Sequence, residues 1–230
     1  VCSSDLVYPL GDLSFDRAYK IFREQISVLA LGRPDFIILE TFSDMGEMRA
    51  ALIAAKDSCN IPIICSFTFE KNRTLTGVSP ASAAVVMESL GAAAIGANCS
   101  GGPRELFPVA KEIMANTSLP VIIQPNAGLP TIRGEETHFT MHAEEFAEAM
   151  KPYLDLGIPI IGSCCGSTPA FSKALREMVS SFESFPSPRR IKKRSTFAGR
   201  ESIVVADEKL PTIIIGERIN PSARKNLKAS

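Results

Sequence analysis

The hydrophobic positions of this chain form two alternating patterns. Short apolar runs of strand length are each followed by a longer stretch in which apolar residues recur at helical spacing. Ahead of them lies a predicted helix at residues 14–31, with Ser14 as its N-cap. The predicted strands are residues 36–40, 61–69, 92–99, 119–126 and 158–165. The helices that follow them are residues 45–58, 79–90, 104–116, 142–156 and 169–182, with a long loop expected before the fourth of these.

Repeated strand–helix units of this length indicate a parallel α/β sheet. No dinucleotide-binding GxGxxG sequence follows the first strand, and polar residues stand at the end of every predicted strand. This pattern favours a (β/α)8 TIM barrel, in which functional residues gather at the carboxyl ends of the strands. A complete barrel takes about 250 residues, and only five units fit before Phe182. We therefore predict an incomplete barrel.

A change of composition after the last predicted helix indicates a domain boundary. Residues 184–194 (SFPSPRRIKKR) are rich in proline and serine and then basic, which is more typical of a solvated interdomain linker than of a site for anions. Residues 210–220 (LPTIIIGERIN) again have the pattern of a buried strand. The sequence thus predicts the C-terminal part of a barrel at residues 1–183, a linker at residues 184–210 and the truncated start of a second domain at residues 211–230.

Charge and hydropathy exclude several classes of partner. The 25 basic and 25 acidic side chains leave no net charge, so electrostatics predict neither a nucleic-acid nor a membrane partner. No apolar run approaches the roughly 18 residues of a membrane span, and no signal peptide is visible. The predicted location is cytoplasmic. In that compartment, six cysteines indicate metal binding or catalysis rather than a disulfide framework.

Three cysteines stand at the ends of two predicted strands. Cys99 lies in GANCSGGP after the third strand, and Cys164 and Cys165 lie in GSCCGSTP after the fifth. In a barrel both strand ends face the same mouth, and a catalytic zinc site takes three protein ligands and keeps one position open. The alternative is that Cys99 is a small core residue and that the pairing of Cys164 with Cys165 is incidental. The glycines that flank both motifs favour a metal site. Two other cysteines lack such contexts and are predicted to be ordinary buried thiols: Cys59 and Cys65.

Two histidines offer a weaker metal signal. His138 and His142 have the i, i+4 spacing of a metal-binding pair. Threonines accompany them in a segment that precedes a predicted helix, and no third ligand is near in the sequence. We therefore expect a helix-start and surface location for this pair.

The two cysteine motifs together resemble a known family. GANCSGGP and GSCCGSTP are similar to the homocysteine S-methyltransferase domain, whose zinc is held by one cysteine of the first motif and both of the second. The tail GERINPSARK is similar to the opening of the pterin-binding domain that follows in cobalamin-dependent methionine synthase. The resemblance runs from about Leu10 to the end. It implies the fourth to eighth strands of the first barrel, without its first three, and the first strand of a second α/β barrel.

The resemblance also implies roles for individual residues. Cys99, Cys164 and Cys165 would be the zinc ligands, and Glu40, in ILETFSD, would hold the amino group of homocysteine. A carboxylate suits that role because an ammonium group favours a charged acceptor. Without the family match, the alternative for Glu40 is an acid at the start of the following helix.

In the tail, Glu217 and Asn220 match polar residues that face the pterin in the family. However, the family's TGR after GERIN is replaced by Ser222, Ala223 and Arg224. Almost all of the second barrel lies outside this chain. We therefore expect no folate binding from the chain by itself.

The implied function is zinc-dependent transfer of a methyl group to the thiolate of homocysteine, which forms methionine. The donor would be methylcobalamin, bound by another domain of a parent chain that also carries a folate domain. One alternative is a betaine- or S-methylmethionine-type homocysteine methyltransferase, which the GERIN tail argues against. The other is a thiolate metal-binding fragment that is inactive alone, because three barrel strands lie outside it.

Overall fold

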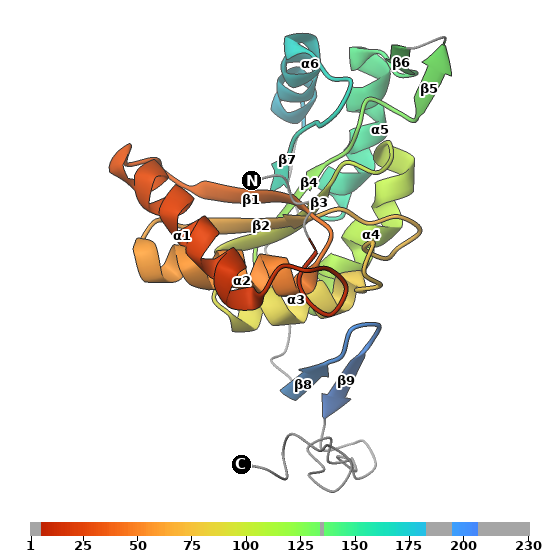
Figure 1. Cartoon of the computed structure of the whole chain (residues 1–230). Helices are drawn as coiled ribbons and strands as arrows, with labels where there is room; N and C mark the ends of the chain where they lie inside the picture. Colours follow the sequence, from red (N-terminus) through yellow and green to blue (C-terminus); the bar gives the residue numbers. More distant parts are fainter. Residues whose placement is uncertain (1–5, 134–135, 183–194, 207–230) are drawn as a thin grey trace, which may run out of the picture.

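The computed structural model describes residues 6–133, 136–182 and 195–206 (Figure 1). Its centre is a parallel sheet in the order β1-β2-β3-β4-β7, in which every pair of neighbours is parallel. The predicted parallel α/β sheet of five strands is therefore confirmed. Its strands are β1 (Ile37–Phe42), β2 (Ile63–Phe67), β3 (Ala94–Asn98), β4 (Val121–Gln124) and β7 (Ile160–Ile161). The strand predicted at residues 210–220, with Glu217 and Asn220, lies outside the described residues, as does the basic run at 184–194.

Six helices accompany these strands in the described part of the chain, and each lies within two residues of its predicted bounds. Side chains cap three of them: Ser14 accepts a hydrogen bond from Arg17 N at 3.2 Å, and Asp44 and Ser79 cap the second and third helices in the same way. Such caps satisfy amide groups that have no partner within the helix. The helices are α1 (Phe15–Leu31), α2 (Met45–Ser58), α3 (Pro80–Ser89), α4 (Pro103–Asn116), α5 (Ala143–Asp155) and α6 (Pro169–Ser180).

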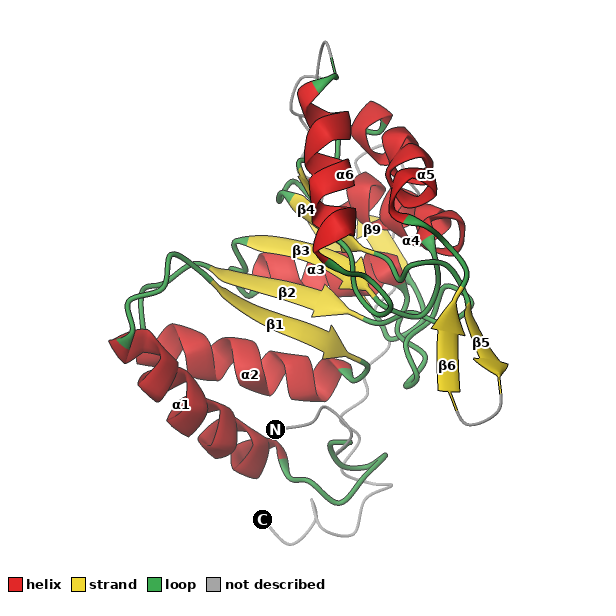
Figure 2. Ribbon diagram, turned by 90° about the horizontal axis from the view of Figure 1, so that it is seen from above, coloured by secondary structure: helices red, strands yellow, loops and turns green. Residues whose placement is uncertain are grey.

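The two faces of the sheet have different surroundings. One face packs against the helices through a large core that includes Cys65 and Phe67 of β2 and Met48 of α2, all without exposed surface. Figure 2 shows α1 and α2 running along the β1 side of this face. The opposite face carries a second cluster to which each strand contributes one aliphatic residue and the described helices contribute none. Its members are Ile38, Ile64, Ala94, Ile122 and Ile160.

The segment after β4 differs from its prediction. A long loop was predicted there, but β5 (Pro130–Arg133) and β6 (Glu136–Phe139) pair as an antiparallel hairpin. Four-residue strands are too short to show a clear two-residue hydrophobic period, so the pattern did not separate them from a loop. Phe139 of this hairpin lies beside Gly166, the residue that follows the Cys164–Cys165 pair, because a Cβ on Gly166 would stand 2.2 Å from the phenylalanine ring.

A second antiparallel hairpin, also not anticipated, lies within the segment predicted as a linker. It consists of β8 (Ser195–Ala198) and β9 (Ile203–Ala206). Its turn is bonded to the loop before α3, where Ser79 N donates to the Arg200 carbonyl at 3.1 Å and the Arg73 guanidinium donates to the Glu201 carbonyl. The composition of residues 184–194 is typical of a linker, and the apolar run IVVA of β9 is too short to indicate a strand by its hydrophobic period.

The fifth strand of the sheet is much shorter than predicted. It was expected over residues 158–165, but β7 covers only Ile160–Ile161. Gly162 N still donates to the Ile123 carbonyl at 2.9 Å, after which the chain leaves the sheet. The cysteine pair therefore lies in a loop beyond the strand. None of the described helices is both long and apolar enough to cross a membrane.

Candidate metal centre

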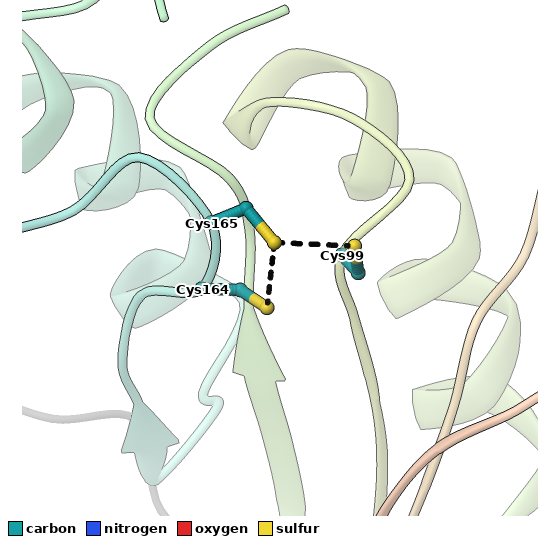
Figure 3. A group of neighbouring side chains, drawn as sticks. All are labelled: Cys99, Cys164 and Cys165. Atoms are coloured by element: carbon teal, nitrogen blue, oxygen red, sulfur yellow. Dashed lines mark hydrogen bonds between the residues drawn. The ribbon is translucent and has the colours of Figure 1, made fainter. Parts of the chain in front are cut away.

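The three strand-end cysteines converge, as the sequence predicted. Sγ of Cys165 lies 3.8 Å from Sγ of Cys99 and 3.9 Å from Sγ of Cys164, and all three sulfurs are within 4.8 Å of one another. Figure 3 shows the side chains pointing toward one another across the space between the two loops. All three are free thiols; Cys99 and Cys164 are half-buried and Cys165 is exposed. The cluster is therefore open to solvent on one side.

The first loop turns sharply so that Cys99 can face the cluster. Cys99 and Ser100 both have left-handed backbone conformations, with φ of 62° and 63°. Non-glycine residues adopt this region uncommonly, and such conformations concentrate at functional sites. Cys99 N donates to the Gln124 carbonyl at 3.1 Å, and Asn126 N donates to the Gly101 carbonyl at 2.9 Å. These bonds attach the first loop to the residues that follow β4.

The second loop is attached to the other side of the same segment. Cys164 N donates to the Pro125 carbonyl at 2.7 Å, and Ala127 N donates to the Cys165 carbonyl at 2.9 Å. Gly166 then turns the chain with φ of 78°. Residues 124–127 thus lie between the two cysteine loops and set their spacing through the backbone.

Asn126 contributes with its side chain, a role that sequence reasoning missed. Its Oδ1 accepts a hydrogen bond from Cys165 N at 3.1 Å. The Asn126 side chain also helps to lower the pKa of Cys99, which favours the thiolate form of that cysteine. The sequence carries one signal for this role. Asn126 is a polar residue at the end of the predicted strand at residues 119–126, and in chain order this strand lies between the two that carry the cysteines.

The dimensions of the cluster fit a tetrahedral zinc ion. A Zn–S bond of about 2.3 Å places two sulfurs of a regular tetrahedron about 3.8 Å apart. The two S–S distances in the cluster, 3.8 and 3.9 Å, are close to this value. Among the described residues, this is the only group of three or more potential metal ligands that converges in this way.

The thiols of the cluster differ in acidity. The pKa of Cys99 is lowered to about 5, chiefly by the neighbouring Cys164 thiol, with further help from Ser100 N–H, Cys165 and Asn126. The neighbouring Cys99 sulfur in turn raises the pKa of Cys164. Burial, followed by the charge on Cys99, raises the pKa of Cys165. Cys99 is therefore the most acidic thiol of the cluster, and a metal ion bound by all three would displace the protons that the thiols still carry.

Glu40 lies in β1, on the same face of the sheet as Ile38, and its side chain is exposed. The alternative prediction, an acid at the start of a helix, is wrong because α2 begins at Met45 and its cap is Asp44. Directly after Glu40, the pairing of β1 with β2 is shifted, and Thr41 has φ of 63°. The carboxylate is thus carried by a strand next to an irregular turn.

The two histidines take no part in this centre. His138 is an exposed residue of β6, and His142 occupies the N-cap position of α5 without a capping side-chain bond. Neither belongs to a converging metal-ligand group in the described part of the chain. The helix-start location predicted for the pair is confirmed for His142.

Comparison with known proteins places the chain in a family. The sequence profile described as Homocysteine S-methyltransferase matches residues 2–179. This chain belongs to the homocysteine S-methyltransferase family. Two curated relatives are methionine synthases: that of Mycobacterium tuberculosis is 27% identical over 222 residues, and that of Mycobacterium leprae is 26% identical over 221 residues. These matches cover 91% and 90% of this chain but only 18% of each relative.

A solved member of the family shares the fold. The apo form of the homocysteine methyltransferase MmuM of Escherichia coli superposes with a TM-score of 0.62 at 19% identity, over 75% of this chain and 61% of that one. Its metallated form superposes with a TM-score of 0.61 at 18% identity, over 72% of this chain and 52% of that one. This chain and that enzyme therefore share the arrangement of parallel strands and helices.

Proposed function

We propose that this chain holds zinc through Cys99, Cys164 and Cys165 and binds homocysteine for a methyl transfer that forms methionine. The observation that carries the proposal is the convergence of three free thiols, with spacings close to the edge of a zinc tetrahedron. Membership of the homocysteine S-methyltransferase family supports the choice of substrate. The methionine synthase relatives and the GERIN tail favour methylcobalamin as donor over betaine or S-methylmethionine.

The cysteines and Glu40 would have different roles in the reaction. The three cysteines supply thiolate ligands and leave a fourth position for the substrate sulfur. Bound zinc would lower the pKa of the homocysteine thiol and so provide a thiolate at neutral pH. Three thiolate charges exceed the charge of the ion, so the cysteines keep the substrate sulfur electron-rich. Glu40 would hold the ammonium group of homocysteine by a charge-assisted hydrogen bond.

This chain would be one segment of a larger protein. In it, the five strands of the sheet correspond to the fourth to eighth strands of a (β/α)8 barrel within residues 1–183. Residues 184–210 join that barrel to a pterin-binding domain that begins within residues 211–230, where Glu217 and Asn220 would face the pterin. A cobalamin-binding domain would belong to the same parent chain, as would this pterin-binding domain, which is the folate domain. Support comes from the mycobacterial methionine synthases, of whose length this chain spans less than a fifth.

Replacing each ligand in turn tests the metal assignment. We expect Cys99→Ser, Cys164→Ser and Cys165→Ser each to abolish retention of one zinc per chain, measured by elemental analysis after dialysis. Methyl transfer from supplied methylcobalamin to homocysteine should be lost as well. Cys59→Ser is the control, because Cys59 is a half-buried thiol that donates to the Ala55 carbonyl outside the cluster. Normal zinc content in any of the three ligand variants would refute the assignment.

Proton release separates an enzyme from a passive metal site. Addition of homocysteine to the zinc-loaded chain should release about one proton per chain at pH 7, because the bound thiol becomes a thiolate. Zinc binding without this release would leave only the non-catalytic fragment. The pH change of a weakly buffered solution measures it directly.

Replacement of Glu40 tests the substrate contact independently of the metal. Glu40→Gln retains the shape of the side chain but removes its charge, so the bond to the ammonium group is weakened. We expect homocysteine to bind the zinc-loaded variant about 10- to 100-fold more weakly, in line with hydrogen bonds to charged groups, while zinc content is unchanged. Isothermal titration calorimetry measures the affinity. Glu24→Gln, an exposed change on α1, should have no effect; equal affinities for both variants would exclude Glu40.

A further inference from the structure

Asn98 is the last residue of β3 and has no exposed surface. Its side chain joins β3 to β2, its neighbour in the sheet, and to β1, the next strand beyond β2. Oδ1 accepts from Thr41 N at 3.1 Å and from Ser66 Oγ at 2.7 Å. Nδ2 donates to Thr41 Oγ1 at 2.6 Å and lies 3.7 Å from Sγ of Cys164, within reach of an N–H···S bond. Both lone pairs and both protons of the amide therefore have partners.

The surroundings determine which way this amide faces. Thr41 N is a backbone group that can only donate, so the oxygen of the Asn98 side chain must be the atom that meets it. The NH2 group is consequently directed toward Cys164. A rotated amide would place two donors together at Thr41 and leave the sulfur without a donor.

The same amide also holds an irregular piece of β1. Thr41 is β-branched and has φ of 63°, a conformation that such residues rarely adopt. It lies where the β1–β2 register shifts, and both of its bonds to Asn98 hold it there. Glu40 precedes it directly. One buried side chain therefore contacts a cysteine of the metal centre and the residue next to the carboxylate proposed to hold the substrate.

We propose that Asn98 is a positioning residue that orients Cys164 for metal binding and holds the turn that carries Glu40. The inference rests on the proposed zinc site. Groups that hydrogen-bond to metal ligands fix their orientation and tune their donation to the metal, and their loss costs about 10- to 100-fold in metal affinity. An N–H···S bond draws electron density from the Cys164 sulfur, so it also alters the electronic spectrum of a bound transition metal.

Asn98→Asp removes this bond selectively. A carboxylate still accepts from Thr41 N and from Ser66, and the Thr41 hydroxyl can reverse and donate to it, but nothing remains to donate to Cys164. We expect the variant to bind Zn2+ about 10- to 100-fold more weakly in competition with a chelating dye. Loaded with Co2+, it should show its thiolate-to-cobalt charge-transfer band at longer wavelength than the wild-type chain, because the sulfur is more electron-rich.

Two matched variants separate positioning from support of the fold. Ser66→Ala deletes one hydrogen bond to the same amide but leaves its donor to Cys164, so it should reduce thermal stability without moving the cobalt band. Asn60→Asp makes the same charge change on an exposed residue before β2 and should leave both affinity and band unchanged. If Asn98→Asp matches the wild-type chain in both measurements, Asn98 has no positioning role. A wild-type chain without any cobalt–thiolate band would instead overturn the metal site itself, and this role with it.

A measurement on the wild-type chain needs no variant and so does not depend on how Asn98→Asp folds. With 113Cd bound, a hydrogen bond from Asn98 to Cys164 should transmit a scalar coupling from cadmium through sulfur to one side-chain amide proton. The coupling is detected by 113Cd-edited proton NMR, and the side-chain amide of Asn60 is the internal control. Absence of the coupling in the cadmium-loaded chain would contradict the proposal.

Discussion

Single cysteine residues in this chain have opposite chemical environments. Cys65, in the middle of β2, has no exposed surface, and burial raises the pKa of its thiol to about 12. Cys99, at the end of the neighbouring strand β3, has its pKa lowered to about 5 by donors, first of all the Cys164 thiol. The difference follows from position along the strand: the middle of a buried strand excludes water, whereas the strand end turns toward solvent and toward donors from other loops.

The buried thiol makes stability depend on alkaline pH. Above pH 9 the unfolded chain loses the Cys65 proton that the folded chain retains, so the free energy of unfolding falls as pH rises from 9 toward 12. Cys65→Ala removes this effect. We expect the variant to be less stable at pH 7, and the difference to shrink by about 1 kcal/mol at pH 10. Urea unfolding at both pH values measures it, with Cys59→Ala as control; a constant difference between Cys65→Ala and wild type would contradict the pKa shift.

At the scale of whole elements, helix starts and hairpins contribute differently to the fold. Three of the helices begin where a local side chain caps them, as Ser14 does for α1. The hairpin of β8 and β9 is instead held by a distant part of the chain, since its turn carbonyl at Arg200 accepts from Ser79, the cap of α3. Local caps are visible as sequence patterns, whereas a hairpin that docks through backbone atoms has no characteristic residue type.

The cap of α1 is a test at this scale. Ser14→Ala leaves the Arg17 amide without its acceptor and should lower the free energy of unfolding by about 1 kcal/mol. Ser14→Asp should retain most of the stability, because aspartate also accepts this bond and its charge suits a helix N-terminus. Thermal unfolding followed by circular dichroism compares the three chains. Equal losses in both variants would show that the hydroxyl acts through something other than capping.

For the molecule as a whole, the cysteine cluster joins distant parts of the chain. Cys99 and Cys164 are 65 positions apart (164 minus 99), and α4, β4, the hairpin of β5 and β6, α5 and β7 lie between them. Their sulfurs converge only when this intervening segment is folded. An ion held by all three cysteines therefore binds the folded state alone and stabilises it.

Metal removal should consequently lower stability. A folded chain that holds the proposed zinc ion would gain about 2.7 kcal/mol over the metal-free form when free zinc is at 100 times its dissociation constant. We expect the midpoint of thermal unfolding to fall on addition of a chelator and to recover when zinc is restored. In Cys99→Ser the midpoint should be the same with and without zinc. A zinc-dependent shift of equal size in that variant would mean that the ion binds elsewhere.

Much of the fold and the centre of the site were predictable from local patterns. Hydrophobic periodicity located every described helix to within two residues and the order of the five parallel strands along the chain. The glycine-flanked motifs identified Cys99, Cys164 and Cys165, because parallel strand ends share one edge of the sheet. Those features depend on residues close together in the sequence, and the sequence alone therefore determined them.

Only the tertiary structure decided what surrounds the cysteines. The Asn98 side chain is hydrogen-bonded to Thr41, 57 positions away in the sequence, and to Cys164, 66 positions away. Asn126 is hydrogen-bonded to Cys165, 39 positions away. No periodicity or motif encodes such pairs, because a hydrogen bond between distant residues depends on the relative placement of whole strands. The sequence by itself determined which thiols meet. The packing of the sheet decided how far apart they lie, which of them has the lowest pKa and which amide faces the sulfur of Cys164.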